Sequence, residues 1–271
     1  MEEPYGGPRD QESREALVDM NVVFLAGTAG SGKSLLTAAL KNWYVNRGED
    51  AIAVNLDPGV VDLPYDPDVD IRERIQLQEV MEDYGLGPNG ALILAADLVA
   101  TKIGDLQDEI DSHRAENVIV DTPGQTELFA FRESGGFIVN EIRADSKILL
   151  FLIDPLLAST PANFLSLALL SASVGLRLNI PKITVLTKRD IARDGVKRIT
   201  EWSRDTKIFE DALAGTKDGE QYSLYSELFR SIKRLSFGTD LYPVSSTTLD
   251  GMIALVGEMA RIARGGEEFT E

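Results

Sequence analysis

Eight consecutive residues near the N-terminus have the types and spacing that bind a triphosphate. They read GTAGSGKS, match the pattern G-x-x-x-x-G-K-[ST], and lie between a predicted strand and a predicted helix. The glycines let backbone N–H groups face anionic oxygens, and the helix N-terminus adds a partial positive charge. We expect Lys33 to reach the β- and γ-phosphates and the Ser34 hydroxyl to bind Mg²⁺. The predicted phosphate-binding residues are Gly27, Thr28, Ala29, Gly30, Ser31, Gly32, Lys33 and Ser34.

A second segment, VIVDTPGQTE at 118–127, follows another predicted strand. Asp121 ends that strand, at the edge where an open α/β sheet binds ligands, and we expect it to support Mg²⁺ directly or through water. Gly124 would let the backbone approach the γ-phosphate, and Gln125 and Glu127 are candidates to orient the attacking water. Alone, DTPG could be an ordinary turn after a strand. Its position after the first motif favours the catalytic interpretation.

The segment ITVLTKRD at 183–190 predicts which base is bound. A carboxylate accepts two parallel hydrogen bonds, and guanine, unlike adenine, offers N1–H and the 2-amino group side by side. Asp190 therefore predicts GTP rather than ATP, and Lys188 can lay its aliphatic stem along the base. Thr187 stands where many GTPases have Asn, which leaves the hydrogen bond that fixes this loop open. The later stretch PVSS would supply a backbone N–H to guanine O6 near Ser245.

Apolar runs predict the strands that bring these segments together. Most of them lack alternation, as strands covered on both faces do, which favours a parallel sheet. Helical patterns lie between them, beginning at Lys33 and, for one long helix, running from Gly90 to Ile110. The alternation predicts a three-layer α/β/α P-loop NTPase fold with a mostly parallel central sheet. The predicted strands are 22–26, 51–56, 117–121, 148–154, 182–187 and 241–245, and the other predicted helices are 72–83, 161–174, 221–235 and 249–263.

The length of 271 residues fits one large α/β domain. We expect a single domain over 19–264, with a helical insertion near 190–240, where the sequence is polar and its pattern irregular. A flexible arm at 1–18 and a flexible tail at 265–271 would flank it.

The composition argues against several other classes of chemistry. The chain has no cysteine and one histidine, His113 in a polar stretch, so disulfides, thiol nucleophiles and multi-histidine metal sites lack their parts. A net charge of −17 argues against direct nucleic-acid binding. No apolar run approaches the roughly eighteen residues of a membrane span, and the N-terminus is not a signal peptide. We expect a cytoplasmic protein with no membrane contact.

Five segments, taken in order, resemble the GPN-loop GTPases. They are GTAGSGKS, NLDPGVVDLPYDPDVDIRERI, GLGPNGAL, DTPGQTE and TKRD, and the likeness covers about residues 20–264. The resemblance implies a Mg²⁺-dependent GTPase that forms a homodimer, in which the turn Gly87-Pro88-Asn89 of one subunit inserts into the phosphate site of the other. It also implies that Asp57 joins Gln125 and Glu127 in the set that orients water and supports the metal.

Simple chemistry makes a role for this turn reasonable. An asparagine amide carries both a donor and an acceptor, proline fixes φ, and flanking glycines allow a tight turn. Asn89 would thus be held where charge develops during phosphoryl transfer. In an arbitrary protein the same turn would only begin a helix, with Asn89 near the N-cap.

Three functional hypotheses remain open. The first is a GTP-hydrolysing homodimeric switch that acts as an assembly factor. The second is a GTP-stabilised dimeric scaffold with incidental hydrolysis, and the third is an ATP-dependent small-molecule kinase, against which Asp190 argues. Eukaryotic members of the family are associated with RNA polymerase assembly, so the resemblance implies, by analogy, a client such as RNA polymerase subunits or chaperones. The sequence names neither the client nor the residue that orients the water.

Overall fold

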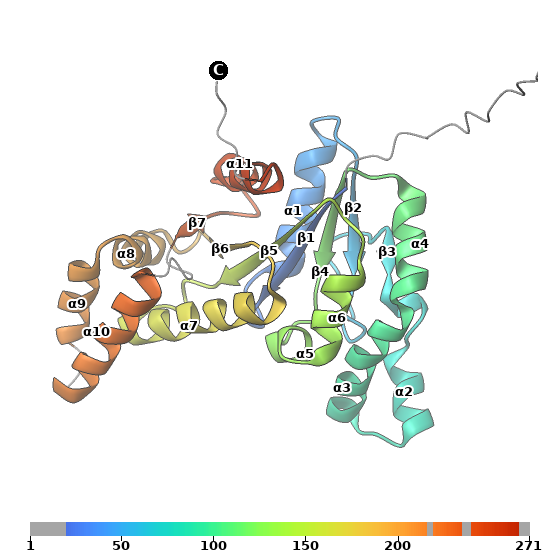
Figure 1. The fold of residues 1–271 in the computed structure, drawn as a ribbon, viewed down its shortest axis with the longest axis horizontal. Coiled ribbons are helices and arrows are strands. Elements are labelled where there is room, and N and C mark those ends of the chain that lie inside the picture. Colours follow the sequence, from blue (N-terminus) through green and yellow to red (C-terminus); the bar gives the residue numbers. More distant parts are fainter. Residues whose placement is uncertain (1–19, 216–218, 235–239, 266–271) are drawn as a thin grey trace, which may run out of the picture.

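The computed structural model describes residues 20–215, 219–234 and 240–265, and its centre is a parallel sheet (Figure 1). In this part of the chain the sheet has seven strands in the order β3-β2-β4-β1-β5-β6-β7. This confirms the predicted fold class. The strands are β1 (Asn21–Gly27), β2 (Ala51–Asn55), β3 (Val69–Asp70), β4 (Asn117–Asp121), β5 (Ser146–Ile153), β6 (Lys182–Leu186) and β7 (Leu241–Pro243).

The central strands are apolar on both faces because both faces are covered. In β1, Phe24 belongs to one hydrophobic cluster and Leu25 to a second cluster on the other side of the sheet. The parallel register then fixes the site. Asp121 at the end of β4 lies level with Leu25 of β1 and with Asn55 at the end of β2. The loops that follow these strands therefore meet at one edge of the sheet.

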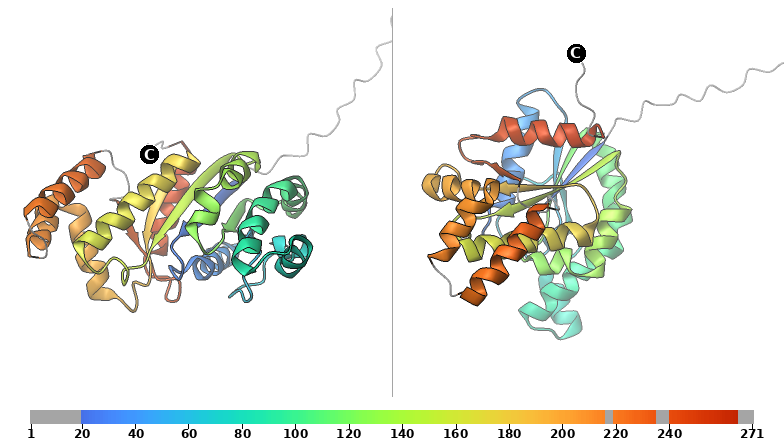
Figure 2. Two further views of the ribbon diagram at one scale, coloured as in Figure 1. Left: turned by 90° about the horizontal axis from the view of Figure 1, so that it is seen from below. Right: turned by 60° about the vertical axis from the view of Figure 1, so that its left-hand side comes forward.

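Helices form the outer layers, and Figure 2 shows α11 and α7 on opposite sides of the strands. The first layer is α1 (Lys33–Val45) and α11 (Met252–Ala263), which share one apolar cluster with the sheet. The remaining helices with buried apolar residues pack mainly in the other cluster. They are α2 (Leu77–Tyr84), α3 (Pro88–Val99), α4 (Ile103–His113), α5 (Thr126–Ala130), α6 (Glu133–Glu141), α7 (Pro161–Leu178), α8 (Arg193–Arg204), α9 (Thr206–Ala214) and α10 (Gly219–Arg234).

The long helix predicted from Gly90 to Ile110 is wrong in one respect, because it is two helices. A short 3-10 segment, Ala100–Lys102, separates α3 from α4. The Thr101 hydroxyl donates to the carbonyl of Leu98 at 2.7 Å, and such bonds compete with the regular helical pattern. The predicted helix at 72–83 likewise divides into a 3-10 turn, Ile71–Glu73, and α2.

Two other parts of the chain differ from the sequence-based expectation. The two-residue strand β3 was not expected, because a pair of residues among Asp and Pro carries no strand pattern. Helices α5 and α6 follow the DTPG turn, where none was predicted. The described part of the predicted insertion near 190–240 is helical, as α8, α9 and α10. The predicted arm at 1–18 and residues 266–271 of the predicted tail lie outside the described residues.

Helix α7 bears on the expected absence of a membrane span. It has 18 residues and is apolar enough to cross a membrane by length and composition alone, contrary to the sequence-based expectation, and 44% of it is buried in the fold. Its buried residues include Phe164, Leu165 and Ala168, which belong to the main core cluster. A core helix of an α/β sandwich has these properties, so α7 gives no support for a span.

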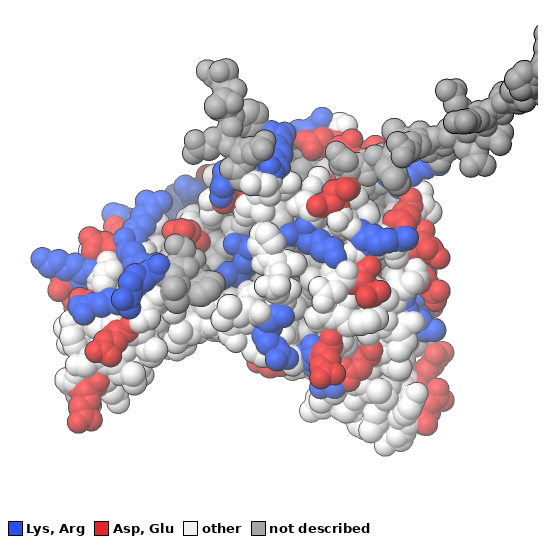
Figure 3. Space-filling view, viewed as in Figure 1, with Lys and Arg blue, Asp and Glu red and all other residues white. Residues whose placement is uncertain are grey.

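Charge is unevenly distributed over the surface. Figure 3 shows Lys and Arg side chains gathered over α8–α10 and Asp and Glu side chains along α4. Helix α8 alone carries Arg193, Lys197, Arg198 and Arg204. The net charge of −17 thus coexists with a local basic surface, which the composition did not indicate.

Candidate nucleotide site

The ammonium group of Lys33 joins the two predicted phosphate-binding motifs. The side chain is only 6% exposed, and its Nζ donates to the carbonyls of Gly27 at 2.9 Å, Thr28 at 3.1 Å and Gly124 at 3.0 Å. Burial lowers the pKa of Lys33, while the carboxylates of Asp121 and Asp57 oppose that shift. The structure therefore places a buried cation between the first motif and the DTPG turn.

The loop Gly27–Ser34, called the phosphate loop below, needs glycine at specific positions. Gly27 has a φ of +152°, and a Cβ there would lie 2.5 Å from the carbonyl oxygen of Leu152. Gly30 and Gly32 have φ values of +72° and +93°, in the left-handed region that favours glycine. These conformations shape the loop so that it leads into the N-terminus of α1, where an anion is stabilised.

Asp121 has the environment of a metal-supporting carboxylate. Its Oδ2 accepts a hydrogen bond from the Tyr65 hydroxyl at 3.0 Å, and its buried Oδ1 has no partner among the described residues. Burial raises the pKa of Asp121 to about 6, while hydrogen bonds from Ser34 and Tyr65 and the charge of Lys33 lower it. An unpartnered carboxylate oxygen beside a serine hydroxyl fits the ligand preference of Mg²⁺.

The described residues contain no cluster of three His, Cys, Asp or Glu side chains able to hold a metal by themselves. That agrees with Mg²⁺ in nucleotide sites, which binds to one or two protein oxygens and takes its other ligands from phosphates and water.

Asp57 joins the loop after β2 to the DTPG turn. Its Oδ1 accepts from the N–H of Gly59 at 2.9 Å, and its Oδ2 accepts from the N–H of Gly124 at 3.0 Å. With Lys33, Ser34 and Asp121 it lines a cavity of about 370 Å³. The structure thus brings together the predicted metal-supporting residues Ser34, Asp57 and Asp121.

A segment to which the sequence analysis gave no role beyond the family resemblance lines this cavity. Val60, Leu63 and Pro64 line it, and Tyr65 follows directly. Arg72 holds the segment, because its guanidinium donates to the carbonyls of Val60 at 3.2 Å and Val61 at 3.1 Å. The same guanidinium is paired with Asp70 at 2.6 Å. Neither Tyr65 nor Arg72 stands in a recognisable catalytic motif, so sequence reasoning missed both contacts.

The predicted base-reading loop is tied to the rest of the site. The Thr187 hydroxyl donates to the carbonyls of Ser31 at 2.9 Å and Ile153 at 3.2 Å, so threonine supplies the loop-fixing hydrogen bond that the sequence left open. Lys188 has a φ of +57°, and its Nζ pairs with the buried carboxylate of Asp154 at 2.7 Å. Asp154 was missed because it follows β5 without a motif around it.

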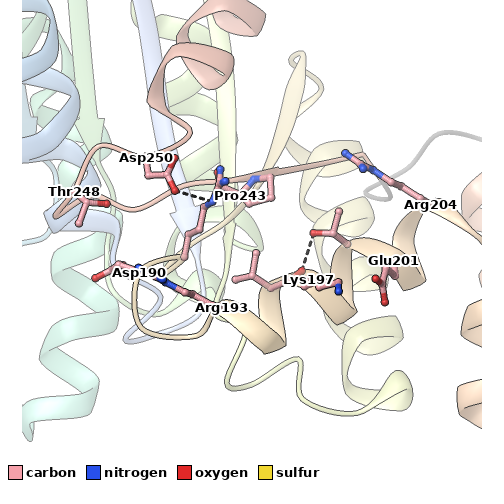
Figure 4. Close-up of a pocket in the computed structure, with 11 residues that line it drawn as sticks. Asp190, Arg193, Lys197, Glu201, Arg204, Pro243, Thr248 and Asp250 are labelled. Atoms are coloured by element: carbon pink, nitrogen blue, oxygen red, sulfur yellow. Dashed lines mark hydrogen bonds and ion pairs between the residues drawn. The ribbon is translucent and has the colours of Figure 1, made fainter.

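Asp190 lies at one end of a cavity of about 860 Å³. Figure 4 shows Thr248 near Asp190 at that end. The α8 side of the cavity is lined by Arg193, Lys197 and Arg204. Ser245, predicted to read guanine O6, is fully buried, and its N–H donates to the carbonyl of Asp250 at 2.9 Å. That amide is therefore engaged within its own loop in this conformation.

The remaining predicted residues lie outside the phosphate cavity. Gln125 and Glu127 are exposed at the start of α5, directly after Gly124. The turn between α2 and α3 carries Gly87, Pro88 and Asn89, all of which are exposed. Figure 1 shows this turn at the bottom of the molecule, on the side toward which β1 and β4 run.

Asn89 lies near the N-cap of α3, as the sequence suggested, although it is not the cap residue itself. The N-cap of α3 is Gly87, with Pro88 as the first helical residue, because proline has no N–H to lose there and its φ is already helical. Gly87 has an ordinary φ of −74°, so the turn does not require glycine for its conformation. Asn89 is inside the first turn of α3 and its exposed side chain caps nothing, which leaves the amide available to another molecule.

Comparison with known proteins gives consistent matches. A protein-family model described as "Conserved hypothetical ATP binding protein" matches residues 25–264. A GPN-loop GTPase of Pyrococcus abyssi is 33% identical over 192 residues, which are 70% of this chain and 74% of that protein. GPN-loop GTPase 1 of Dictyostelium discoideum is 32% identical over 238 residues, 86% of this chain and 58% of that protein.

Among solved structures, a Pyrococcus abyssi GTPase in apo form is similar over 91% of this chain and 98% of its own, with 27% identity and a TM-score of 0.78. The chain spans a smaller part of its eukaryotic relatives. It covers 63%, 64%, 58% and 65% of the proteins matched from Saccharomyces cerevisiae, Arabidopsis thaliana, Dictyostelium discoideum and Schizosaccharomyces pombe, which is less than two thirds of each.

Proposed function

Because this chain belongs to the GPN-loop GTPase family, we propose that it binds GTP with Mg²⁺ and hydrolyses it as a homodimer. One observation carries the proposal. The Lys33 ammonium group bridges the phosphate loop and Gly124 beside Asp121, a buried carboxylate with an unpartnered oxygen. A cation and a metal-supporting carboxylate held at the N-terminus of α1 form a site for the charge of a triphosphate.

The chain's own groups have separate roles in this mechanism. Lys33 and the backbone amides of the phosphate loop hold and orient the phosphates. Ser34, Asp57 and Asp121 are the residues that would hold Mg²⁺, which supplies positive charge to the β- and γ-phosphate oxygens when bound. Gln125 and Glu127, exposed directly after Gly124, and Asp57 are the candidates to orient the attacking water; Asp57 also fixes the DTPG turn through the Gly124 N–H.

Base selection supports GTP over ATP. The carboxylate of Asp190 matches the paired donors of guanine, and the ion pair with Asp154 fixes the direction of the Lys188 stem. The description of the matching family names ATP, whereas the named relatives are GTPases. The carboxylate of Asp190 favours GTP over ATP.

The homodimer supplies a part that one chain lacks. In the described part of the chain, no arginine and no amide side chain lines the phosphate cavity. Asn89 is exposed on a projecting turn and lines none of the cavities described above. We propose that it reaches the triphosphate of a second copy, where a preorganised amide stabilises developing charge.

A hydrolysis assay tests this function. With Mg²⁺ and no acceptor molecule, phosphate should be released from GTP much faster than from ATP, and mass measurement should give a dimer. Tight GTP binding without turnover would favour the scaffold, and turnover that depends on an added acceptor would favour a kinase. A protein client, such as RNA polymerase subunits or chaperones, is part of the proposal by family resemblance alone, and a cytoplasmic location is part of it from composition.

A further inference from the structure

The helix that begins with the GPN turn packs directly on the loop after β2. A Cβ built on Gly59 would lie 2.4 Å from Cδ1 of Leu92, so the end of this half-buried leucine side chain must shift if residue 59 carries a side chain. The φ of Gly59 is not in the left-handed region, so a substitution at 59 acts through the contact with Leu92 and not through backbone strain. Leu92 comes three residues after Asn89 in α3, a spacing that makes the two neighbours on the helix surface.

The loop under Leu92 is part of the phosphate site. The N–H of Gly59 donates to Oδ1 of Asp57 at 2.9 Å, while Oδ2 of the same carboxylate accepts from Gly124 at 3.0 Å. A displacement of the loop around a γ-phosphate would therefore move the surface on which Leu92 rests. Gly59 and Leu92 are both half-buried, and a shift at such a contact moves the side chain that rests on it.

A second contact attaches the other half of α3 to the same side of the site. Nε and Nη2 of Arg132 donate to the two carboxylate oxygens of Asp97, and the Ser134 hydroxyl donates to Asp97 Oδ1 at 2.9 Å. Arg132 precedes α6 and follows α5, the helix that leads out of the DTPG turn. The loop after β2 thus contacts α3 through Leu92, and the connection between α5 and α6, one helix beyond the DTPG turn, holds α3 through Asp97.

We propose that Gly59 and Leu92 are positioning residues for the GPN turn. Through them, the phosphate-side loop of one subunit sets where its Asn89 is presented to the other subunit. The inference rests on the proposed function, since Asn89 must act on a second copy's nucleotide. It adds that the active site of each subunit depends on the conformation of the loop after β2 in its twin.

Mixed dimers made from two differently tagged chains test the inference. The first chain carries Asn89→Ala and keeps an intact phosphate site. The second carries Lys33→Ala and serves as the donor of Asn89. Hydrolysis then occurs only at the first chain's site. Adding Gly59→Ala to the donor should lower kcat at that site by about 100-fold with KM for GTP unchanged, because a displacement of about 1 Å is enough for such a loss.

Removing the overlapping side chain should reverse the effect. Leu92→Ala, combined with Gly59→Ala on the donor, should restore kcat to within a few-fold, and hydrogen exchange of α3 should change in parallel. Gly104→Ala on the donor is the matched control, because a Cβ there meets no described atom within 4 Å. It should leave kcat unchanged.

The outcomes separate the inference from the function it rests on. If the mixed dimer without Gly59→Ala does not hydrolyse GTP, the proposed action of Asn89 across subunits fails. If it hydrolyses GTP and Gly59→Ala on the donor has no effect, the positioning role fails. A loss that Leu92→Ala does not restore would also overturn it, since the damage would then arise within the loop, where the added Cβ lies 3.4 Å from Asp57 Oδ1.

Discussion

Thr187 donates its hydroxyl hydrogen to the backbone carbonyl of Ser31 at 2.9 Å, across 156 positions of sequence. The bond joins the base-reading loop directly to the phosphate loop. Both residues are buried, so the oxygen of Ser31 has no access to water as a substitute partner. The loop predicted to read the base and the loop predicted to bind phosphates are thus fixed to each other at the carboxyl edge of the sheet.

Thr187→Val should therefore weaken both stability and nucleotide binding. The substitution keeps the shape but leaves the Ser31 carbonyl without this donor, which costs about 1–3 kcal/mol in the free energy of unfolding. Urea unfolding and a GTP titration measure the two effects. Thr187→Ser, which keeps the hydroxyl, is the control and should retain most of the affinity. Equal affinity in all three proteins would show that the bond does not support the site.

Asp190→Asn should exchange the preferred base. An amide offers one donor and one acceptor where the carboxylate offers two acceptors, so it matches xanthine, whose position 2 carries a carbonyl oxygen. We expect GTP hydrolysis to fall by about 100-fold or more and xanthosine triphosphate to become the better substrate. Competition between the two nucleotides gives the ratio directly. An unchanged preference for GTP would refute the assignment of Asp190.

Much of the phosphate side follows from the sequence because local chemistry dictates it. A glycine-rich loop between a strand and a helix has few alternatives, so the position of Lys33 could be predicted. Asp121 follows from the same reasoning, since a carboxylate that ends a buried parallel strand lies at the ligand edge. The apolar runs also predicted strands buried on both faces, and β1 is one.

The residues that sequence reasoning missed act through contacts distant along the chain. Tyr65 reaches Asp121 across 56 positions, and Asp154 reaches Lys188 across 34, so no local pattern marks either. The helix predicted from Gly90 begins two residues earlier for a local reason, since Pro88 takes the first helical position and leaves Gly87 as the cap. The break after α3 occurs where the Thr101 hydroxyl donates to the carbonyl of Leu98. The spacing of apolar residues does not reveal such a side-chain hydrogen bond.

Tyr65→Phe should weaken metal binding while sparing the nucleotide. The phenol orients Asp121 by donating to Oδ2, which leaves Oδ1 unpartnered for the metal or its water. Loss of such an orienting partner lowers metal affinity by about 10- to 100-fold. Mn²⁺ affinity of the nucleotide complex, measured by electron paramagnetic resonance, is the readout. The control is GTP affinity measured with a chelator present, which should be the same in Tyr65→Phe and in the unsubstituted protein. If Tyr65→Phe binds Mn²⁺ as tightly as the unsubstituted protein, or more tightly, Tyr65 does not orient Asp121.

Lys182 should make stability depend on pH far from the nucleotide site. It lies at the start of β6, and its Nζ donates to the hydroxyl of the fully buried Ser171 at 2.7 Å. Burial lowers the pKa of Lys182 to about 8 from an ordinary value of 10.5. Because the unfolded chain binds this proton more tightly, the group's destabilising effect is full below pH 8 and is relieved as pH rises from about 8 to 10.5.

Lys182→Met tests this dependence by removing the proton-binding group. The variant should gain stability over the natural chain at pH 7, on the order of 1 kcal/mol after allowance for partial exposure, and the gain should shrink by pH 10. Urea unfolding at both pH values gives the difference, in which other titrations cancel. Lys197→Met removes an exposed lysine of α8 and controls for loss of net charge. A gain from Lys182→Met that is the same at pH 7 and pH 10 would show that the ammonium group is not destabilised by its surroundings.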